Sequence, residues 1–491
     1  MNIKPVLAVL FSFAFFGSHC VAQDTGPFFG NGMRNSWANQ DSIVIWTRTT
    51  RVPEMIVGPN FKEVDPKKLP KEVREANDNS LYLTKQLADD HKLDQMLGAC
   101  PGMAGKVRLK YHPRNQSARE LTTDWITTKK ELDFTAQWKL TKLKPNTEYV
   151  VTGECQPEDG SKTVTLIGGF KTAPRKNQSV NLKFCVTTCH DFLRRDDGEK
   201  GHKIYVPMKE MEPDFVVHAG DIEYYDKAKP YAFTKKLMRF KWQRIFSMPR
   251  NRDFYTNHST YFIKDDHDTL SNDSWPGKKY GNVTFAEGVT LFNKEQFPSH
   301  PTRYETISWG KDVQFWILEG RDYRSSNKKP DGPDKSILGA EQKAWLKKSL
   351  AESKAKFKLI FSPTPIVGPD RNNKSDNHAN DVFAHEGKEL RAFFETIDGV
   401  IVFCGDRHWQ YASVDADNGI WEFGCGPGSE AHQLGWKKDD VRPVHKFLRV
   451  AGGFISGEVV VKNDDPKLII RHHSVKGDPK SKFVFPVASE K

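Results

Sequence analysis

The chain has 491 residues, of which 37% are apolar and 28% are charged, and it contains 32 Phe and 12 Trp. This composition supports a buried core and excludes a chain that is disordered throughout, while the length suits two domains better than one. The net charge of +11 favours anionic partners such as phosphate esters, anionic polymers or lipid head groups, but no dense basic block or nucleic-acid-binding module accompanies it.

The first 22 residues have the pattern of a secretory signal peptide. Lys4 precedes an almost unbroken apolar run over residues 6–16, and the small residues at 20–22 suit cleavage. The run has about half the length of a membrane span, and no other stretch approaches ~18 apolar residues. We therefore predict an exported protein, secreted or periplasmic, without a transmembrane segment. Lipid attachment at Cys20 is an alternative that His19 disfavours.

Residues 23–176 are predicted to form a small all-β domain that is similar to fibronectin-type or immunoglobulin-like modules. Its strand-like patterns, separated by turns, lie at residues 42–48, 106–111, 143–152 and 168–174. A polar, Lys-rich stretch near 53–104 interrupts them and is expected to be a helical or irregular insertion. Six cysteines follow residue 22, and Cys100 with Cys155 is a plausible disulfide within this domain.

From residue 180 to residue 491 the pattern changes to that of a layered α/β domain, in which apolar strands alternate with helices. The predicted strands lie at 182–188, 214–218, 313–318, 357–361, 399–404, 420–424 and 454–461, and the clearest helices at 339–350 and 385–396. The polar stretches 269–303, 324–336 and 368–384 are expected to be surface loops that border a site.

Residues that bind metal ions follow the strand-like stretches at four places. The four groups are Cys189-His190-Asp191, Gly220-Asp221 with Tyr224, Asp265-Asp266-His267-Asp268, and Gly405-Asp406 with His408. Sites in open α/β sheets lie beyond the carboxyl ends of the strands, so these groups are expected to converge. Carboxylates, an imidazole and a thiolate suit divalent or trivalent cations. Each group alone has an ordinary structural explanation, but together they indicate a metal centre.

In this order the four groups resemble the motifs of the alkaline phosphatase D (PhoD-like) family, within the calcineurin-like metallophosphoesterase superfamily. Residues 318–324 and 338–346 are also similar to stretches of that family, and the resemblance covers roughly residues 27–460. It implies a layered α/β/β/α metallophosphoesterase sandwich preceded by the small all-β domain. It also implies hydrolysis of phosphate mono- or diesters by a metal-activated hydroxide.

The same resemblance implies a centre of iron with one or two calcium ions. Cys189 and Tyr224 would be thiolate and phenolate ligands of ferric iron, and Asp221 would be shared between metals. The other ligands it implies are Asp266, Asp406, His408 and, as a further acidic contributor, Asp191. His267 would act near the leaving-group oxygen as general acid or hydrogen-bond donor. Arg321 would clamp the phosphate, with a structural salt bridge as its alternative.

Three features depart from the family's pattern and leave the substrate open: the continuation after Asp268, Glu319 in place of an Asp, and Glu223, which adds charge to the centre or faces solvent. The ester is a monoester or a diester, including one on a membrane surface or an anionic polymer.

Two other interpretations compete with this one. A purple acid phosphatase would have Gly-Asn-His and Gly-His-x-His in the last two motifs, which this chain lacks. A catalytically silent secreted protein would bind phosphorylated or sulfated polymers. Such a protein would be free to lose Cys189, Asp221 or His408, and this chain keeps all three.

Overall fold

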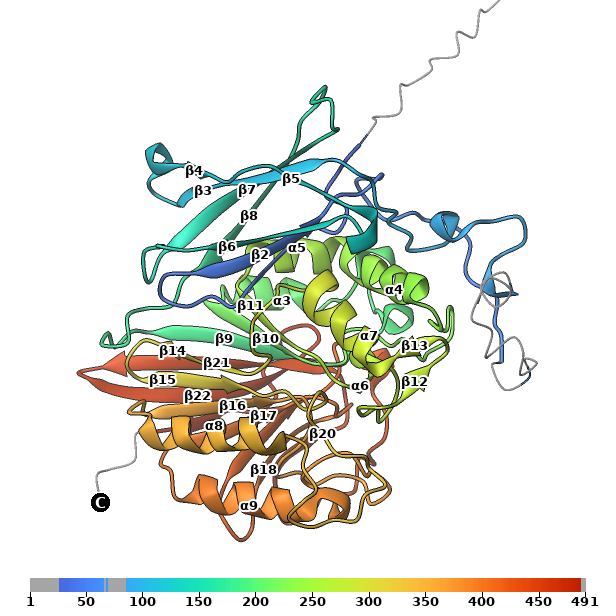
Figure 1. The fold of residues 1–491 in the computed structure, drawn as a ribbon. Coiled ribbons are helices and arrows are strands. Elements are labelled where there is room, and N and C mark those ends of the chain that lie inside the picture. Colours follow the sequence, from blue (N-terminus) through green and yellow to red (C-terminus); the bar gives the residue numbers. More distant parts are fainter. Residues whose placement is uncertain (1–25, 66–67, 69–84, 487–491) are drawn as a thin grey trace, which may run out of the picture.

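The computed structural model describes residues 26–65, 68 and 85–486 (Figure 1). The predicted signal peptide lies outside these residues, as do residues 66–67 and 69–84 of the predicted insertion. The described part of the insertion is mostly irregular, with a short 3-10 turn at Leu93–Gln95. No helix in the described part of the chain combines the length and the apolar character that crossing a bilayer requires.

Two antiparallel sheets are built from residues before 172. The first has the order β1 (Met33–Ser36), β2 (Ile43–Arg48), β6 (Thr135–Leu140). The second places β3 (Lys106–Pro113), β7 (Glu148–Gln156) and β8 (Val164–Lys171) side by side, with β4 (Leu121–Thr122) and β5 (Ile126–Thr127) paired to β3. Val107 and Leu109 of β3 are fully buried while their neighbours are half-buried, as expected for a strand with one face on a core.

Two larger sheets lie face to face in the rest of the chain. The six-stranded sheet has the order β11 (Thr260–Ile263), β10 (Phe215–Ala219), β9 (Leu182–Thr187), β21 (Gly453–Lys462), β22 (Asp465–Ser474), β23 (Phe483–Phe485). The seven-stranded sheet has the order β14 (Glu305–Trp309), β15 (Val313–Ile317), β16 (Phe357–Ser362), β17 (Val400–Cys404), β19 (Trp421–Cys425), β18 (Gln410–Val414), β20 (His445–Arg449). Strands β9, β10 and β11 run parallel, as do β15, β16, β17 and β19.

Helices cover the outer faces of both sheets (Figure 1). Those beside the six-stranded sheet are α3 (Tyr205–Glu210), α4 (Lys235–Ser247), α5 (Pro249–Asn257) and α7 (Phe285–Thr290), and those beside the seven-stranded sheet are α8 (Gly339–Glu352) and α9 (Ala384–Glu395). Side chains of β16 alternate between the layers: Phe361 packs against Phe184 of the facing sheet, whereas Ile360 joins the cluster under α8 and α9. The predicted α/β fold is confirmed.

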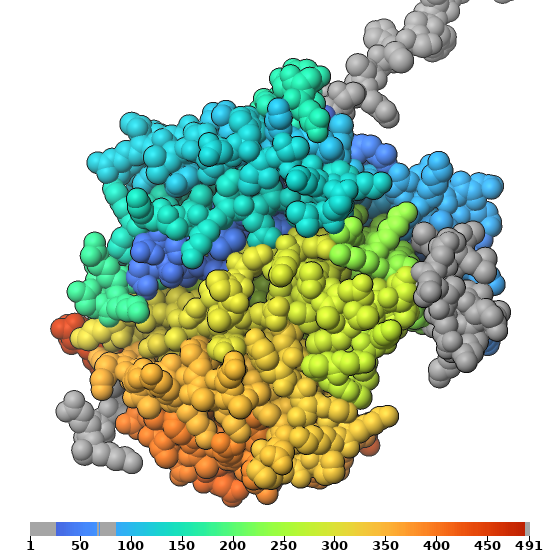
Figure 2. Space-filling model, viewed as in Figure 1, coloured from blue at the N-terminus to red at the C-terminus, as the bar shows by residue number. Residues whose placement is uncertain are grey.

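The N-terminal sheets pack directly on the α/β layers. The Asn35 amide donates a hydrogen bond to the Thr256 carbonyl (3.0 Å), and the Trp46 indole donates one to the Glu295 carbonyl (2.7 Å). One cluster of buried apolar side chains runs from Leu109 in β3 to the strands of both large sheets. In Figure 2 the N-terminal residues, blue to cyan, accordingly meet the green and yellow ones along a continuous boundary.

Two predictions are wrong in detail. All six cysteines in the described part of the chain are free, so Cys100 and Cys155 form no disulfide. Cys155 Sγ instead donates to the Pro27 carbonyl at 3.1 Å. The stretch 269–303, predicted as a loop, contains the hairpin strands β12 (Lys279–Tyr280) and β13 (Val283–Thr284), α7 and a π-helical turn at Leu291–Gln296. A capping box between Thr284 and Glu287 starts α7, whose Phe285 and Val289 join the core.

Candidate metal centre

The candidate site lies where four strands end. Cys189 follows β9, Asp221 follows β10, Asp265 and Asp266 follow β11, and Asp406 follows β17. Because β9, β10 and β11 are parallel neighbours, their carboxyl ends meet at one edge of the six-stranded sheet. The end of β17 in the facing sheet completes the site.

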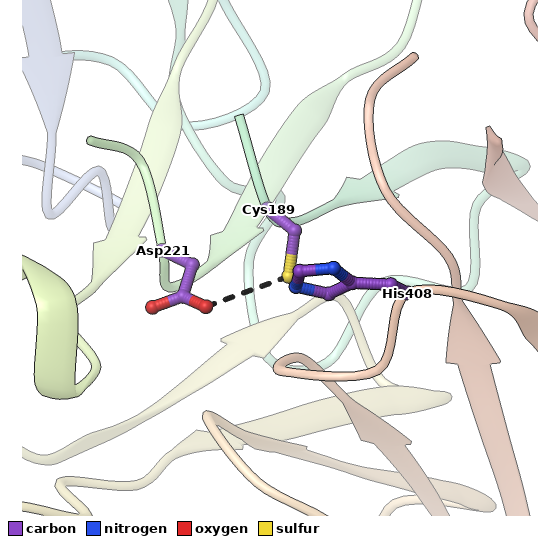
Figure 3. A group of neighbouring side chains, drawn as sticks. All are labelled: Cys189, Asp221 and His408. Atoms are coloured by element: carbon purple, nitrogen blue, oxygen red, sulfur yellow. Dashed lines mark hydrogen bonds between the residues drawn. The ribbon is translucent and has the colours of Figure 1, made fainter. Parts of the chain in front are cut away.

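Cys189, Asp221 and His408 form the first group of potential metal ligands (Figure 3). Their ligand atoms lie within 4.8 Å of one another, and Cys189 Sγ is 3.7 Å from Asp221 Oδ2. The Tyr224 hydroxyl donates to Asp221 Oδ2 at 3.0 Å and lies 3.3 Å from His408 Nε2. A thiol, a carboxylate, an imidazole and a phenol from three loops therefore meet at one point.

Asp221 also belongs to two further groups in which the ligand atoms lie within 4.8 Å of one another. One contains Asp266 and His267, and the other contains Asp265 and Asp406. A single carboxylate thus stands between three neighbouring candidate positions, which is the arrangement needed for a ligand shared by more than one cation.

The loops that present these ligands turn sharply. Cys189, Asp221 and Asp406 have φ angles of 52°, 56° and 60°, a left-handed conformation that costs a residue with a side chain about 1–3 kcal/mol. Gly220, with φ 95°, packs so closely that a Cβ would stand 2.8 Å from the Asp265 Cβ. Asp268 joins two of the loops, because its carboxylate accepts hydrogen bonds from the backbone N–H groups of Ile222 (2.8 Å) and Asp265 (3.0 Å).

The carboxylates are concentrated and buried, and this raises most of their pKa values. Burial, followed by repulsion from Asp266 and Asp265, raises the pKa of Asp221 well above its usual range. Burial also raises the pKa of Asp265 to about 6, against the opposing effect of Arg321, and that of Asp268 to about 7. Asp266 is the exception, since His267 and Arg321 outweigh burial and lower its pKa. Ionising these carboxyl groups together therefore requires positive charge beyond that of the neighbouring side chains.

Several ligand atoms have no hydrogen-bond partner among the described residues. These buried atoms are Oδ1 of Asp221, Oδ2 of Asp265 and Nδ1 of His408, whereas Oδ2 of Asp406 is in contact with the Arg407 guanidinium. Buried polar atoms normally have a partner, and leaving one without costs about 1–3 kcal/mol. A cation would supply the missing partner and the missing positive charge, so the residues present fit a metal centre.

A model of the PhoD-like phosphatase family matches residues 184–447, which include every group described above. The chain belongs to the PhoD-like phosphatase family. Among curated proteins it is 21% identical over 319 residues to alkaline phosphatase D of Bacillus subtilis (strain 168), a match that covers 55% of this chain and about half of that protein (52%).

Two solved structures share the fold of this PhoD-like chain. The structure of PhoD matches with a TM-score of 0.69 at 16% identity, covering 95% of this chain and 93% of that one. A purple acid phosphatase from yellow lupin (Lupinus luteus) seeds matches with a TM-score of 0.60 at 13% identity, covering 92% and 74%. At these sequence identities the two structural matches establish only the fold. The membership of the PhoD-like family is shown by the match to the family model.

His267 is held by a carboxylate that the sequence analysis did not identify. Asp226 Oδ1 lies 2.6 Å from His267 Nδ1, and Asp226 Oδ2 accepts the backbone N–H of Asn272 at 2.9 Å. Burial lowers the pKa of His267, but Asp226 and Asp266 outweigh it and raise the pKa. With Nδ1 engaged by Asp226, Nε2 is the nitrogen available to the group containing Asp221 and Asp266.

Arg321 is largely engaged by carboxylates of the chain itself. It is fully buried, its Nε donates to Asp265 Oδ1 at 2.5 Å, and its Nη2 lies 3.3 Å from Asp376 Oδ2 and 4.0 Å from Asp266 Oδ1. These carboxylates outweigh burial and raise its pKa. Nε and Nη2 therefore belong to an ion-pair network with the neighbouring carboxylates, as the alternative of a structural salt bridge expects, while Nη1 has no hydrogen-bond partner among the described residues.

Two other acidic residues differ from expectation. Asp191 caps the 3-10 turn Phe192–Arg194 by accepting the Leu193 N–H at 2.9 Å, and it lies 3.6 Å from Arg194. Among the described residues it is in none of the candidate metal groups. Glu223 neither faces solvent nor joins the centre, because it is buried and pairs with Arg244 at 3.1 Å.

Three further carboxylates, to which the sequence assigned no role, lie around the candidate metal centre. Asp265 stands in the third motif, but the resemblance assigned only its neighbour Asp266. Asp273 and Asp376 form a fourth group with Asp266, yet they come from loops rather than strand ends. The Lys374 ammonium lies 2.9 Å from Asp273 and 3.6 Å from Asp376, so this group already has a cation of its own.

Proposed function

We propose that this PhoD-like protein is a metal-dependent phosphoesterase that hydrolyses phosphate esters. The observation that carries the proposal is the position of Asp221, which belongs to three adjacent ligand groups and whose buried Oδ1, like Oδ2 of Asp265, has no hydrogen-bond partner among the described residues. The presence of Cys189, Asp221 and His408 in one group favours an enzyme over a silent binding protein, because a protein that only binds could lose any of these metal-binding residues.

The donor atoms support two kinds of metal. The thiolate, phenolate and imidazole around Asp221 suit iron, whereas the carboxylates of Asp265, Asp266 and Asp406 suit calcium. Bound cations would neutralise the phosphoryl oxygens of the substrate and lower the pKa of a water molecule. The residues of this chain then have to hold the substrate beside the centre and supply or stabilise a proton.

His267 is the residue that we assign to proton chemistry. Asp226 fixes its ring through Nδ1, so Nε2 is presented to the centre in one orientation. From there it donates a proton or a hydrogen bond to the leaving-group oxygen, a role typically worth about 10²–10⁴-fold in rate. No phosphate clamp is assigned to Arg321.

Two parts of the proposal concern the rest of the chain. Residues 1–22 would act as a signal peptide that directs export, to the periplasm or the medium. Residues 23–176 would form a fibronectin- or immunoglobulin-like module ahead of the catalytic part. The positive net charge is compatible with substrates on a membrane surface or an anionic polymer.

The proposal is tested with 4-nitrophenyl phosphate and bis(4-nitrophenyl) phosphate as monoester and diester. We expect hydrolysis of at least one, its loss after treatment with a chelator, and its recovery when iron and calcium are restored. His408→Ala should remove activity while the fold survives. Asp253→Asn, at an exposed carboxylate paired with Lys209, is the matched control and should retain it. Full activity in chelated protein or in the His408→Ala variant would contradict the proposal.

A further inference from the structure

An open hollow of about 530 Å³ is lined by Trp436 and by residues of the loops around 371–373 and 435–442. Of the predicted metal ligands, His408 is the one that is partly exposed, so a substrate reaches the centre on its side. Trp409 follows His408 directly, and its ring packs against Trp436, 4.9 Å away between ring centroids. Trp436 and Arg371 line the hollow and both lie against Trp409, so the hollow is connected to the centre through the residue next to His408.

Three of the side chains that line this hollow are positively charged and two are negatively charged. Arg371, Lys437 and Arg442 line it, against Asp439 and Asp440. Arg442 is already paired with Asp440 at 3.3 Å, in a partly exposed ion pair. Lys437 is exposed, and Arg371 is half-buried.

Arg371 is held in place without a carboxylate of its own. Its guanidinium lies 5.4 Å from the Trp409 ring centroid, and a Cβ at Gly435 would stand 2.6 Å from its Nη1, so the glycine makes room for it. In the described part of the chain, the carboxylate within ion-pair distance is Asp370, 3.5 Å from Nε.

Asp370 is shared with another cation. Arg407 Nη1 donates to Asp370 Oδ1 at 2.8 Å, and the Asn377 amide donates to Oδ2 at 2.7 Å. Burial and repulsion from Arg407 lower the pKa of Arg371. Arg371 thus shares Asp370 with Arg407, which also contacts Asp406, and the charge that Arg371 presents to the hollow is only partly compensated.

We propose that this hollow is a second anion subsite, in which Arg371, with Lys437 and Arg442, holds an additional phosphate group of the substrate. The ester to be cleaved lies at the metal centre, so the inference rests on the proposed function. It assigns the substrate class: phosphate esters that carry a second phosphate near the scissile one are favoured over esters with a single phosphate. A planar guanidinium suits this role because it donates two parallel hydrogen bonds to phosphate oxygens.

Binding provides a test that does not depend on turnover. Calorimetric titration of the metal-loaded protein with thymidine 3′,5′-bisphosphate and with thymidine 5′-monophosphate should show about tenfold tighter binding of the bisphosphate, the gain expected for one charge-assisted hydrogen-bonded contact. Arg371→Gln should remove most of this preference, and Lys437→Gln should reduce it a fewfold. Lys348→Gln, at a side chain that is 77% exposed near the C-terminal end of α8, removes the same charge elsewhere and should retain it.

Hydrolysis then separates the two proposals. The probes are the 5′-(4-nitrophenyl phosphate) esters of thymidine with and without a 3′-phosphate, compared by kcat/KM. A bisphosphate preference in binding without turnover of either ester would support the subsite and contradict the proposed function. Equal binding of the two nucleotides by the wild type, or an unchanged preference in folded Arg371→Gln protein with an unaltered thermal midpoint, would overturn the subsite whatever the hydrolysis shows.

Discussion

Replacing Asp226 by Asn tests the assignment of His267 as the residue that serves the leaving group. The Asp226–His267 contact is short (2.6 Å) and buried, with side-chain exposures of 12% and 8%. A hydrogen bond to a charged group contributes about 1.5–3 kcal/mol. If this energy lowers the activation barrier by orienting the imidazole ring and stabilising its positive charge, it corresponds to a rate increase of about 10–100-fold. Asparagine retains an acceptor oxygen of similar size, so the substitution removes charge more than shape.

The assay compares kcat/KM for 4-nitrophenyl phosphate and phenyl phosphate. Phenolate is the poorer leaving group and needs protonation more, so Asp226→Asn should reduce its hydrolysis by about 10–100-fold and that of the nitrophenyl ester by less. Asp253→Asn should change neither rate. An equal loss for both esters, or no loss, would refute the assignment of a leaving-group role to His267 through Asp226.

Three further predictions concern other parts of the chain. Arg321→Met should lower the free energy of unfolding, measured by denaturant titration, by about 3–5 kcal/mol, because it leaves buried carboxylates such as Asp265 unpaired. A variant with wild-type stability and only a raised KM would instead support the phosphate clamp. Although burial alone would raise it, hydrogen bonds from His378 and neighbouring groups lower the pKa of Glu386 to about 2. The contribution of this carboxylate to stability, about 3 kcal/mol, is therefore present above about pH 4.5 and lost as the pH falls towards 2. Glu386→Gln should weaken the pH dependence of unfolding in that window, and an unchanged slope would show that the ion pair is not coupled to folding. Cys189→Ser should lose iron, as measured by elemental analysis, with little change in circular dichroism; iron retained at the wild-type level would exclude the thiolate as a ligand.

The residues of the candidate metal groups could be predicted because their signal is local. Cys189, Asp221 and His408 each stand two to four residues after an apolar strand, and strand order brings the ends of β9, β10 and β11 to one edge. Strand-end chemistry and an α/β pattern of this kind can be recognised without knowing any long-range contact. The helices at 339–350 and 385–396 follow from periodicity in the same way, and α8 and α9 begin within one residue of these bounds.

The roles of supporting residues depend on contacts between distant segments, and sequence does not supply these. Arg321 stands in a family-like stretch, but only the fold places Asp265 and Asp376, 56 and 55 residues away, around its guanidinium. Asp226 is two residues beyond Tyr224, with no pattern that connects it to His267. Glu223 forms an ion pair with Arg244 of α4 instead of joining the centre, and this helix was not predicted from the sequence.

We propose that one carboxylate, Asp221, is shared by neighbouring metal positions. The test is elemental analysis of iron and calcium per chain in the wild type, in Asp221→Asn and in the control Asp253→Asn. We expect both metals in the wild type and in the control, and the loss of both from folded Asp221→Asn protein. Iron and calcium at wild-type levels in that variant would contradict it.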